Sequence, residues 1–232
     1  MIRINVVAEG QSEMFFVKKQ LSTYLYEKTE KSFVDSRSVL TSKDKKTNNE
    51  SRGGIQNYIK PKQDIISWLK ESDDTYITTM FDLFRLPKDF PGYDLSLTQE
   101  PYMRVQSLEN AFKEDILKGL NINQVRFIPY IQLHEFEALL FTNLDVLKDL
   151  YLEQHFIKGI NKLISEVKGM QPELINNGPT TAPSKRLSSK IPYAKGSDVG
   201  EFLAEIGIDK IRESCEHFSA WIEKLLNLPE LT

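Results

Sequence analysis

Cysteine is almost absent from the sequence, since Cys215 is the only one among 232 residues. A single cysteine excludes an intramolecular disulfide and a zinc site made of several thiolates, and we expect a reducing compartment, the cytoplasm. Long hydrophobic runs are absent too, because the apolar stretches have the length of single strands and Glu9 ends the first of them. We therefore expect no signal peptide and no membrane-spanning helix.

Two enzyme motifs are also missing. The sequence has no glycine-rich phosphate loop, so we do not expect this chain to hydrolyse ATP by itself. A zinc-hydrolase motif that begins at His134 would need a second histidine four residues later, where Ala138 stands. These absences argue against a P-loop ATPase and against a zinc-dependent protease.

Neither sign of charge is in large excess, because 30 basic and 33 acidic side chains leave a formal net charge of −3. This balance argues against a protein that coats nucleic acid by bulk electrostatics. The basic residues nevertheless gather in two segments. Residues 36–62 contain seven basic and two acidic side chains, and residues 183–195 contain four basic and no acidic ones. The first segment is expected to be a flexible surface or a contact for a nucleic-acid backbone.

The composition is that of an ordinary globular protein, with 40% hydrophobic and 27% charged residues. Three β-rich apolar runs predict buried strands, and Pro129 predicts an edge position or a bulge in the last of them. Helical periodicity lies between and after these runs. Strands that alternate with helices indicate an α/β fold with a mostly parallel sheet flanked by helices. The predicted strands are residues 2–8, 75–81 and 125–133.

The elements between these strands are predicted with less regular patterns. Ser12 is the expected N-cap of the first helix, and residues 31–54 are expected to form a long polar excursion outside the core. Residues 105–120 and 209–226 have clear helical stripes. We expect residues 1–142 to form the α/β core and residues 143–232 to form a mostly helical region packed on that core, within a single domain.

Acidic residues follow two of the predicted strands. Glu9 follows the first strand and Asp82 ends the second, and the carboxyl ends of parallel strands share one edge of a sheet. Mg²⁺ prefers such hard oxygen ligands, and Gly10 permits a sharp turn into a helix whose N-terminus favours a bound anion. Glu13, in the first turn of that helix, is an additional candidate. The alternative is that these residues are only polar ends of strands.

Several blocks of the sequence together resemble a known family. The first block, VVAEGQSE at residues 6–13, resembles the first motif of Toprim domains. The chain as a whole is similar to the bacterial domain-of-unknown-function family 4276, a Toprim-like group, across nearly its full length. The other blocks are MFDLFRLP at 80–87, FPG at 90–92, HEFEALLF at 134–141 and APSKRL at 182–187.

The resemblance implies a Toprim-like α/β core in which Glu9 matches the family's lone glutamate and Asp82 matches the first acid of its Asp-x-Asp motif. Phe84 stands where the second aspartate of a Toprim metal site would be. A two-acid metal site here would therefore need a carboxylate from another part of the chain in place of that aspartate. The candidates are Asp89, Asp94 and Glu137.

The segment after the third strand offers three further side chains. If a helix starts there, His134 and Glu137 share a face at positions i and i+3. The functional interpretation puts Glu137, with Glu135 and His134 as additional candidates, beside a metal ion. The alternative interpretation is a segment for capping and packing.

Lys185 and Arg186 are the candidate phosphate contacts in the second basic segment. Arginine can bind a phosphate with two parallel hydrogen bonds, and lysine can offset charge that develops in a transition state. The alternative is a solvated basic patch that also includes Lys195.

The leading hypothesis is a Toprim-like, Mg²⁺- or Mn²⁺-dependent nuclease in which Glu9, Asp82 and Glu137 hold the metal and an activated water attacks the phosphodiester. The resemblance also implies an ATPase partner of the ATP-binding-cassette type and a role in defence against phage. A second hypothesis is a catalytically silent module that binds nucleic acid or an ATPase. A third is a phosphatase or phosphotransferase that acts on small molecules.

Overall fold

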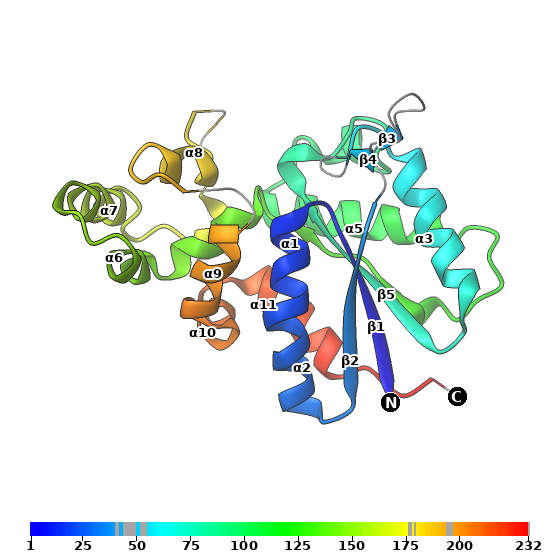
Figure 1. Cartoon of the computed structure of the whole chain (residues 1–232). Coiled ribbons are helices and arrows are strands. Elements are labelled where there is room, and N and C mark those ends of the chain that lie inside the picture. Colours follow the sequence, from blue (N-terminus) through cyan, green and yellow to red (C-terminus); the bar gives the residue numbers. More distant parts are fainter. Residues whose placement is uncertain are drawn as a thin grey trace.

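The chain forms a five-stranded sheet in which all strand pairs are parallel. In the computed structural model, residues 1–39, 42–43, 50–51, 55–175, 178, 180–193 and 197–231 are described. The order is β2-β1-β5-β6, and β7 follows β6 along the same side of β5. Helices flank this sheet, and the C-terminal part is helical, which confirms the predicted α/β class (Figure 1). The strands are β1 (Ile2–Ala8), β2 (Ser32–Ser38), β5 (Thr75–Asp82), β6 (Phe127–Ile128) and β7 (Ile131–Gln132).

The sheet separates two hydrophobic layers. Val6 belongs to a cluster that includes Phe16 and Trp221, whereas its neighbour Val7 belongs to a second cluster that includes Phe112. Successive side chains of a strand point to opposite faces, so adjacent valines serve different layers. All eight residues of β5 are buried, as expected for a parallel strand covered on both faces. The apolar runs that predicted β1 and β5 therefore mark the centre of the sheet.

Strand β2 corrects the sequence analysis, which placed residues 31–54 outside the core. β2 pairs with β1 along its whole length, with Val34 and Ser36 buried while Phe33 and Asp35 are exposed. An edge strand is held by its hydrogen bonds to one neighbour and needs few apolar residues, so its pattern resembled a loop. The remaining positions of the predicted excursion, including Lys45 and Lys46, lie outside the described residues. The short strands β3 (Ser42–Lys43) and β4 (Glu50–Ser51) pair with each other in antiparallel fashion.

The first helical segment follows β1 after a two-residue turn. Gly10 occupies the N-cap position, so the prediction of Ser12 as N-cap is wrong, and no side chain caps the first turn. Glu13 lies in that turn, as predicted. The segment continues without interruption through one π-helical stretch. It comprises α1 (Gln11–Phe16), η1 (Val17–Leu21) and α2 (Ser22–Thr29).

The helices that lead into β5 and connect β5 to β6 agree with most of the expected pattern. Pro61 lies in the first turn of α3, where a missing N–H is tolerated, so the helix continues past it. Gly119 adopts a left-handed conformation (φ 74°) just after α5, which confirms the expected helix end. Pro129 separates β6 from β7, so the third predicted strand consists of two short ones. The other elements are α3 (Ile59–Glu71), η2 (Leu83–Arg85), α4 (Tyr93–Ser96), α5 (Pro101–Leu117) and η3 (Gln124–Arg126).

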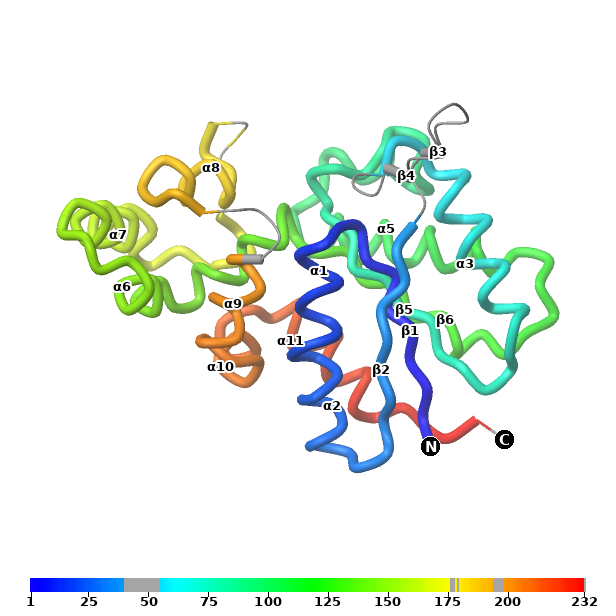
Figure 2. Tube along the Cα trace, in the orientation of Figure 1, coloured from blue at the N-terminus to red at the C-terminus, as the bar shows by residue number. Residues whose placement is uncertain are grey.

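The helices of residues 143–232 divide into two groups in the views of Figures 1 and 2. The helices α6 to α8 project to one side of the sheet, whereas α9 to α11 pack near α1 and α2. The hydrophobic cluster around Phe16 contains side chains from both halves of the chain. The elements are η4 (Phe136–Thr142), η5 (Leu144–Val146), α6 (Leu147–Leu150), α7 (Gln154–Glu166), η6 (Pro172–Leu174), α8 (Pro183–Ser188), α9 (Ser197–Ile206), α10 (Ile208–Ser214) and α11 (Glu216–Leu226).

The stripe that predicted a single helix over residues 209–226 is interrupted at Cys215, whose backbone is extended (φ −120°, ψ 94°). Glu173 explains the break, because its carboxylate accepts hydrogen bonds from the backbone N–H groups of His217 (3.0 Å) and Phe218 (2.8 Å). A distant acid thus caps α11 at its N-terminus. Cys215 is buried in the core, as its position on the stripe predicted. Within the described part of the chain, no helix is long and apolar enough to cross a membrane.

Candidate functional site

Glu9 and Asp82 meet at the carboxyl-terminal edge of the sheet. β1 and β5 are neighbours with Ala8 paired to Met80, so the residues after each strand emerge side by side. The backbone N–H of Asp82 donates a hydrogen bond to Oε2 of Glu9 at 3.1 Å. Both side chains are buried, with exposed fractions of 5% for Glu9 and 6% for Asp82. The structure therefore brings together the two acids that the strand pattern singled out.

Three more buried acids complete what we call the carboxylate cluster: Glu9, Glu13, Asp82, Glu135 and Glu137. Burial raises the pKa of Asp82 well above its usual value, and the negative charges of the other four raise it further. Burial likewise raises the pKa of Glu13 to about 7, with added repulsion from Glu9 and Glu137. The charges of all four other acids thus act on Asp82, and those of Glu9 and Glu137 act on Glu13.

Gly10 allows the close packing at this turn. A side chain at Gly10 would place its Cβ only 3.0 Å from Oε2 of Glu13, so the Glu13 carboxylate lies directly over the backbone of the turn. Any larger residue would displace the carboxylate. Gly10 thus serves both the predicted sharp turn and the close approach of Glu13.

Buried like charges at such proximity cannot all remain ionised without compensation. Protons are one means of compensation, and the raised pKa values of Glu13 and Asp82 favour it. A bound cation is the other means of compensation, and carboxylate oxygens are the ligands that Mg²⁺ and Mn²⁺ prefer.

The cluster fits such a cation by its donor chemistry and only partly by its geometry. Among the residues that the structure describes, no three histidine, cysteine, aspartate or glutamate side chains are arranged to hold one ion. Mg²⁺ often takes only one or two carboxylates from a protein and keeps several waters. Glu9 and Asp82, which the hydrogen bond from the Asp82 N–H to Glu9 Oε2 holds next to each other, are the candidates for that smaller number of ligands.

His134 does not lie on a helical face with Glu137, although its spacing predicted that it would. His134 precedes η4 and has a left-handed backbone (φ 62°), so it does not share a helical face with Glu137. Its carbonyl accepts a hydrogen bond from the Phe84 N–H at 3.0 Å, and burial lowers the pKa of its imidazole. Phe84, in η2, is 49% exposed. The helical spacing failed here because the chain turns sharply at His134 before the 3₁₀ helix begins.

The loop acids do not replace the missing second aspartate. Both carboxylate oxygens of Asp89 accept hydrogen bonds from the backbone N–H of Tyr58, at 3.2 and 3.1 Å, at the start of α3. Asp94 is exposed in the first turn of α4. Of the three acids considered for that place, only Glu137 is among those whose charges raise the pKa of Asp82.

The segment around α8 reaches the cluster through Glu135. The backbone N–H of Ser184 donates to Oε2 of Glu135 at 3.0 Å, and the Ser184 hydroxyl group pairs with Oε1 at 3.1 Å. Lys185, the next residue, is exposed, and Nε of Arg186 donates to the carbonyl of Thr181 at 2.7 Å. The third basic residue considered with this pair, Lys195, lies outside the described residues.

Tyr193 is a neighbour of the cluster that no sequence pattern singles out. Its hydroxyl group donates to the Ser184 carbonyl at 3.3 Å. Burial, the charges of Glu137 and Glu135 and a hydrogen bond to Glu137 raise its pKa. No motif or spacing connects Tyr193 with these acids, because the contact depends on how the C-terminal half folds back.

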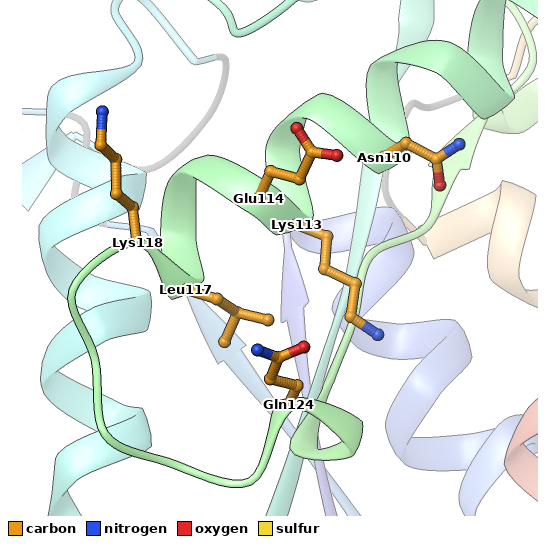
Figure 3. A pocket seen from close by; sticks show the side chains of 6 residues that line it. All are labelled: Asn110, Lys113, Glu114, Leu117, Lys118 and Gln124. Atoms are coloured by element: carbon orange, nitrogen blue, oxygen red, sulfur yellow. The ribbon is translucent and has the colours of Figure 1, made fainter.

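Two open cavities of the described surface lie elsewhere. One, of about 560 Å³, is lined by α5 and by Gln124, which precedes β6 and therefore lies at the amino-terminal edge of the sheet. Figure 3 shows Lys113 and Gln124 reaching toward this cavity while Lys118 points away. Another, of about 620 Å³, is lined by Arg3 and Thr75 at the starts of β1 and β5. Neither is lined by an acid of the carboxylate cluster, so cavity size does not identify the candidate site.

The fold and the carboxylate cluster define an α/β protein with an acidic site at the carboxyl edge of a parallel sheet. The chain belongs to the family described as Domain of unknown function (DUF4276), whose family model matches residues 8–226. This confirms the family resemblance seen in the sequence blocks, and the match includes every acid of the cluster. No curated protein and no solved structure matches the chain.

Proposed function

We propose that this protein is a metal-dependent phosphodiester hydrolase of the nuclease type, with its site at the carboxylate cluster. The observation that carries the proposal is the convergence of five buried acids where parallel strands end. Keeping that many acids together costs stability unless they have a ligand to bind. The placement of Glu9 and Asp82 on neighbouring strands also agrees with the Toprim resemblance.

In this proposal Glu9 and Asp82 hold a Mg²⁺ or Mn²⁺ ion, and Glu137 or Glu13 completes the ligands. When bound, the ion supplies positive charge at the phosphate under attack and favours ionisation of the attacking water. The Glu9 carboxylate is already oriented by the backbone N–H of Asp82. The buried walls around these acids limit access of bulk water and strengthen the electrostatic interactions of the site.

Lys185 and Arg186 are proposed to bind the phosphate groups of the substrate. They follow Ser184, whose contact with Glu135 brings the start of α8 to the cluster. Arg186 uses Nε in its bond to Thr181, which fixes the plane of a guanidinium group suited to phosphate. A cation beside the acids and basic residues at the rim would together accommodate the charge of a phosphodiester.

The direct experiment is cleavage of labelled single-stranded DNA, double-stranded DNA and RNA in Mn²⁺ or Mg²⁺. We expect cleavage of one polymer by the wild type, loss upon addition of EDTA, and a loss of about 100-fold or more in Asp82→Asn, in line with the removal of a group that holds the catalytic ion. Glu114→Gln, an exposed acid of α5, is the matched control and retains activity. Cleavage that persists in EDTA or in Asp82→Asn would refute the proposal.

A second candidate is a catalytically silent module that binds nucleic acid or an ATPase. It is favoured by one observation: no three ligand side chains of the described residues are set around one ion. Under this alternative the wild type binds a polymer but cuts none of the three, with or without an ATP-binding-cassette-type partner. Hydrolysis of a small phosphate ester without cleavage of polymers would instead support the third hypothesis.

A further inference from the structure

We infer that Glu135, Ser184 and Tyr193 are positioning residues that hold the start of α8 against the carboxylate cluster. This inference rests on the proposed function, because α8 carries Lys185 and Arg186, the proposed phosphate contacts. It gives Glu135 a role different from that of a metal ligand, although Glu135 belongs to the same cluster.

The contact between Glu135 and Ser184 is buried and uses both oxygens of the carboxylate. The two residues are 4% and 6% exposed, and their two hydrogen bonds measure 3.0 and 3.1 Å. Hydrogen bonds to an ionised carboxylate are stronger than neutral ones, and a buried partner left alone is costly. The contact spans 49 positions in the chain and joins the end of β7 to a helix that Figure 1 shows beside α6 and α7.

Tyr193 adds a second connection to the same place. Its hydroxyl group donates to the Ser184 carbonyl at 3.3 Å and lies close enough to Glu137 for that carboxylate to raise the pKa of the tyrosine. Ser184 is therefore held through its N–H, its hydroxyl group and its carbonyl. These contacts tie α8 to Glu135 and to Tyr193, which lies near Glu137, a proposed metal ligand.

The residues that follow α8 are held by α7 and by Tyr151, the residue after α6. The hydroxyl group of Tyr151 donates to the Pro192 carbonyl at 2.8 Å. Gly159 lies so close to Lys190 that a Cβ there would be 3.1 Å from the Lys190 carbonyl oxygen. With the residues after α8 anchored, the contacts of Glu135 and Tyr193 determine how near the basic residues come to the acids.

The test measures three quantities on the full chain for Ser184→Ala, Tyr193→Phe and Lys185→Gln/Arg186→Gln. They are amide hydrogen exchange of α8, Mn²⁺ affinity by calorimetry, and affinity for the DNA or RNA oligonucleotide that the wild type binds best. The matched control is Ser189→Ala, because Ser189 is an exposed serine of the same segment whose hydroxyl group donates only to the Arg186 carbonyl, at 2.7 Å.

We expect faster exchange in α8 for Ser184→Ala and Tyr193→Phe, Mn²⁺ affinity within about twofold of the wild type, and oligonucleotide affinity lower by about tenfold at low salt, as for lost phosphate contacts. In the Lys185→Gln/Arg186→Gln background, Ser184→Ala should lower the oligonucleotide affinity little further, because the phosphate contacts that Ser184 positions are already gone. The control should match the wild type in all three quantities.

The outcomes separate this inference from the function on which it rests. Unchanged exchange in Ser184→Ala overturns the inference, and so does oligonucleotide affinity that stays at the wild-type level or falls equally in both backgrounds. Absence of Mn²⁺ binding by the wild type overturns the proposed function instead. Absence of oligonucleotide binding by the wild type overturns both, and faster exchange would then indicate a purely structural contact.

Discussion

Replacement of Glu13 by glutamine should stabilise the metal-free protein at alkaline pH. Burial and the charges of Glu9 and Glu137 raise the pKa of Glu13 from 4.5 to about 7. That difference corresponds to about 3 kcal/mol of folding free energy, because the folded state binds this proton more tightly than the unfolded chain does. Ionisation of Glu13 therefore destabilises the folded state.

The sign of the pH dependence follows from the raised pKa. Below pH 4.5 Glu13 is protonated in both states, and its contribution to stability is fully present. As the pH rises from there through about 7, the unfolded chain releases the proton first, and stability is lost. Above about pH 8 the full cost of about 3 kcal/mol applies to the wild type but not to Glu13→Gln.

The assay is urea unfolding of both proteins in EDTA at several pH values between 5 and 8.5, with the free energy of unfolding extrapolated to water. We expect the advantage of Glu13→Gln over the wild type to grow by about 3 kcal/mol across this range. The exposed Glu114→Gln should follow the wild type. A difference between Glu13→Gln and wild type that does not change with pH would refute the electrostatic account of the cluster.

Three further predictions concern the metal, a helix cap and a buried hydrogen bond. Mn²⁺ at about 100 times its dissociation constant should stabilise the wild type by about 3 kcal/mol at pH 8 and by less at pH 6, because protons compete. At the same Mn²⁺ concentration Glu9→Gln should be stabilised by at most about half as much, as thermal unfolding would show. Glu173→Ala should cost about 2 kcal/mol in urea unfolding, because α11 loses the acceptor of two N–H groups, whereas exposed Glu216→Ala should cost little. Trp221→Phe removes the 2.9 Å hydrogen bond from the indole N–H to Thr78 Oγ1 and should lower the free energy of unfolding by about 1–3 kcal/mol in the same assay. A Trp221→Phe protein as stable as the wild type would contradict a stabilising role of this hydrogen bond.

The centre of the fold could be predicted from the sequence because parallel strands buried on both faces are continuous apolar runs. β1 and β5 have such runs, and both were located correctly. The edge strand β2 alternates buried and exposed residues and contains mostly polar ones, so its membership in the sheet depends on pairing with β1. Pairing between strands separated by a helix is a tertiary property that local composition does not encode.

For the candidate site, too, some contacts could be predicted from the sequence and others could not. Glu9 and Asp82 could be expected to meet, because the ends of neighbouring parallel strands share one edge. The hydrogen bonds of Glu135 to Ser184 and of Tyr193 to the Ser184 carbonyl could not, because they depend on how the C-terminal helices return to the sheet. The left-handed backbone of His134 was also hidden, because helical spacing assumes a regular helix that the structure begins only at Phe136.

The most direct test of the central claim is calorimetric titration of Mn²⁺ into EDTA-stripped protein at pH 8, where competition from protons at the carboxylate cluster is weakest. The account predicts saturable binding by the wild type and by Glu114→Gln, and affinity at least about tenfold weaker in Glu9→Gln, as for the loss of one carboxylate ligand. Absence of binding by the wild type, or equal affinity in Glu9→Gln, would contradict the proposal that the cluster holds a divalent cation.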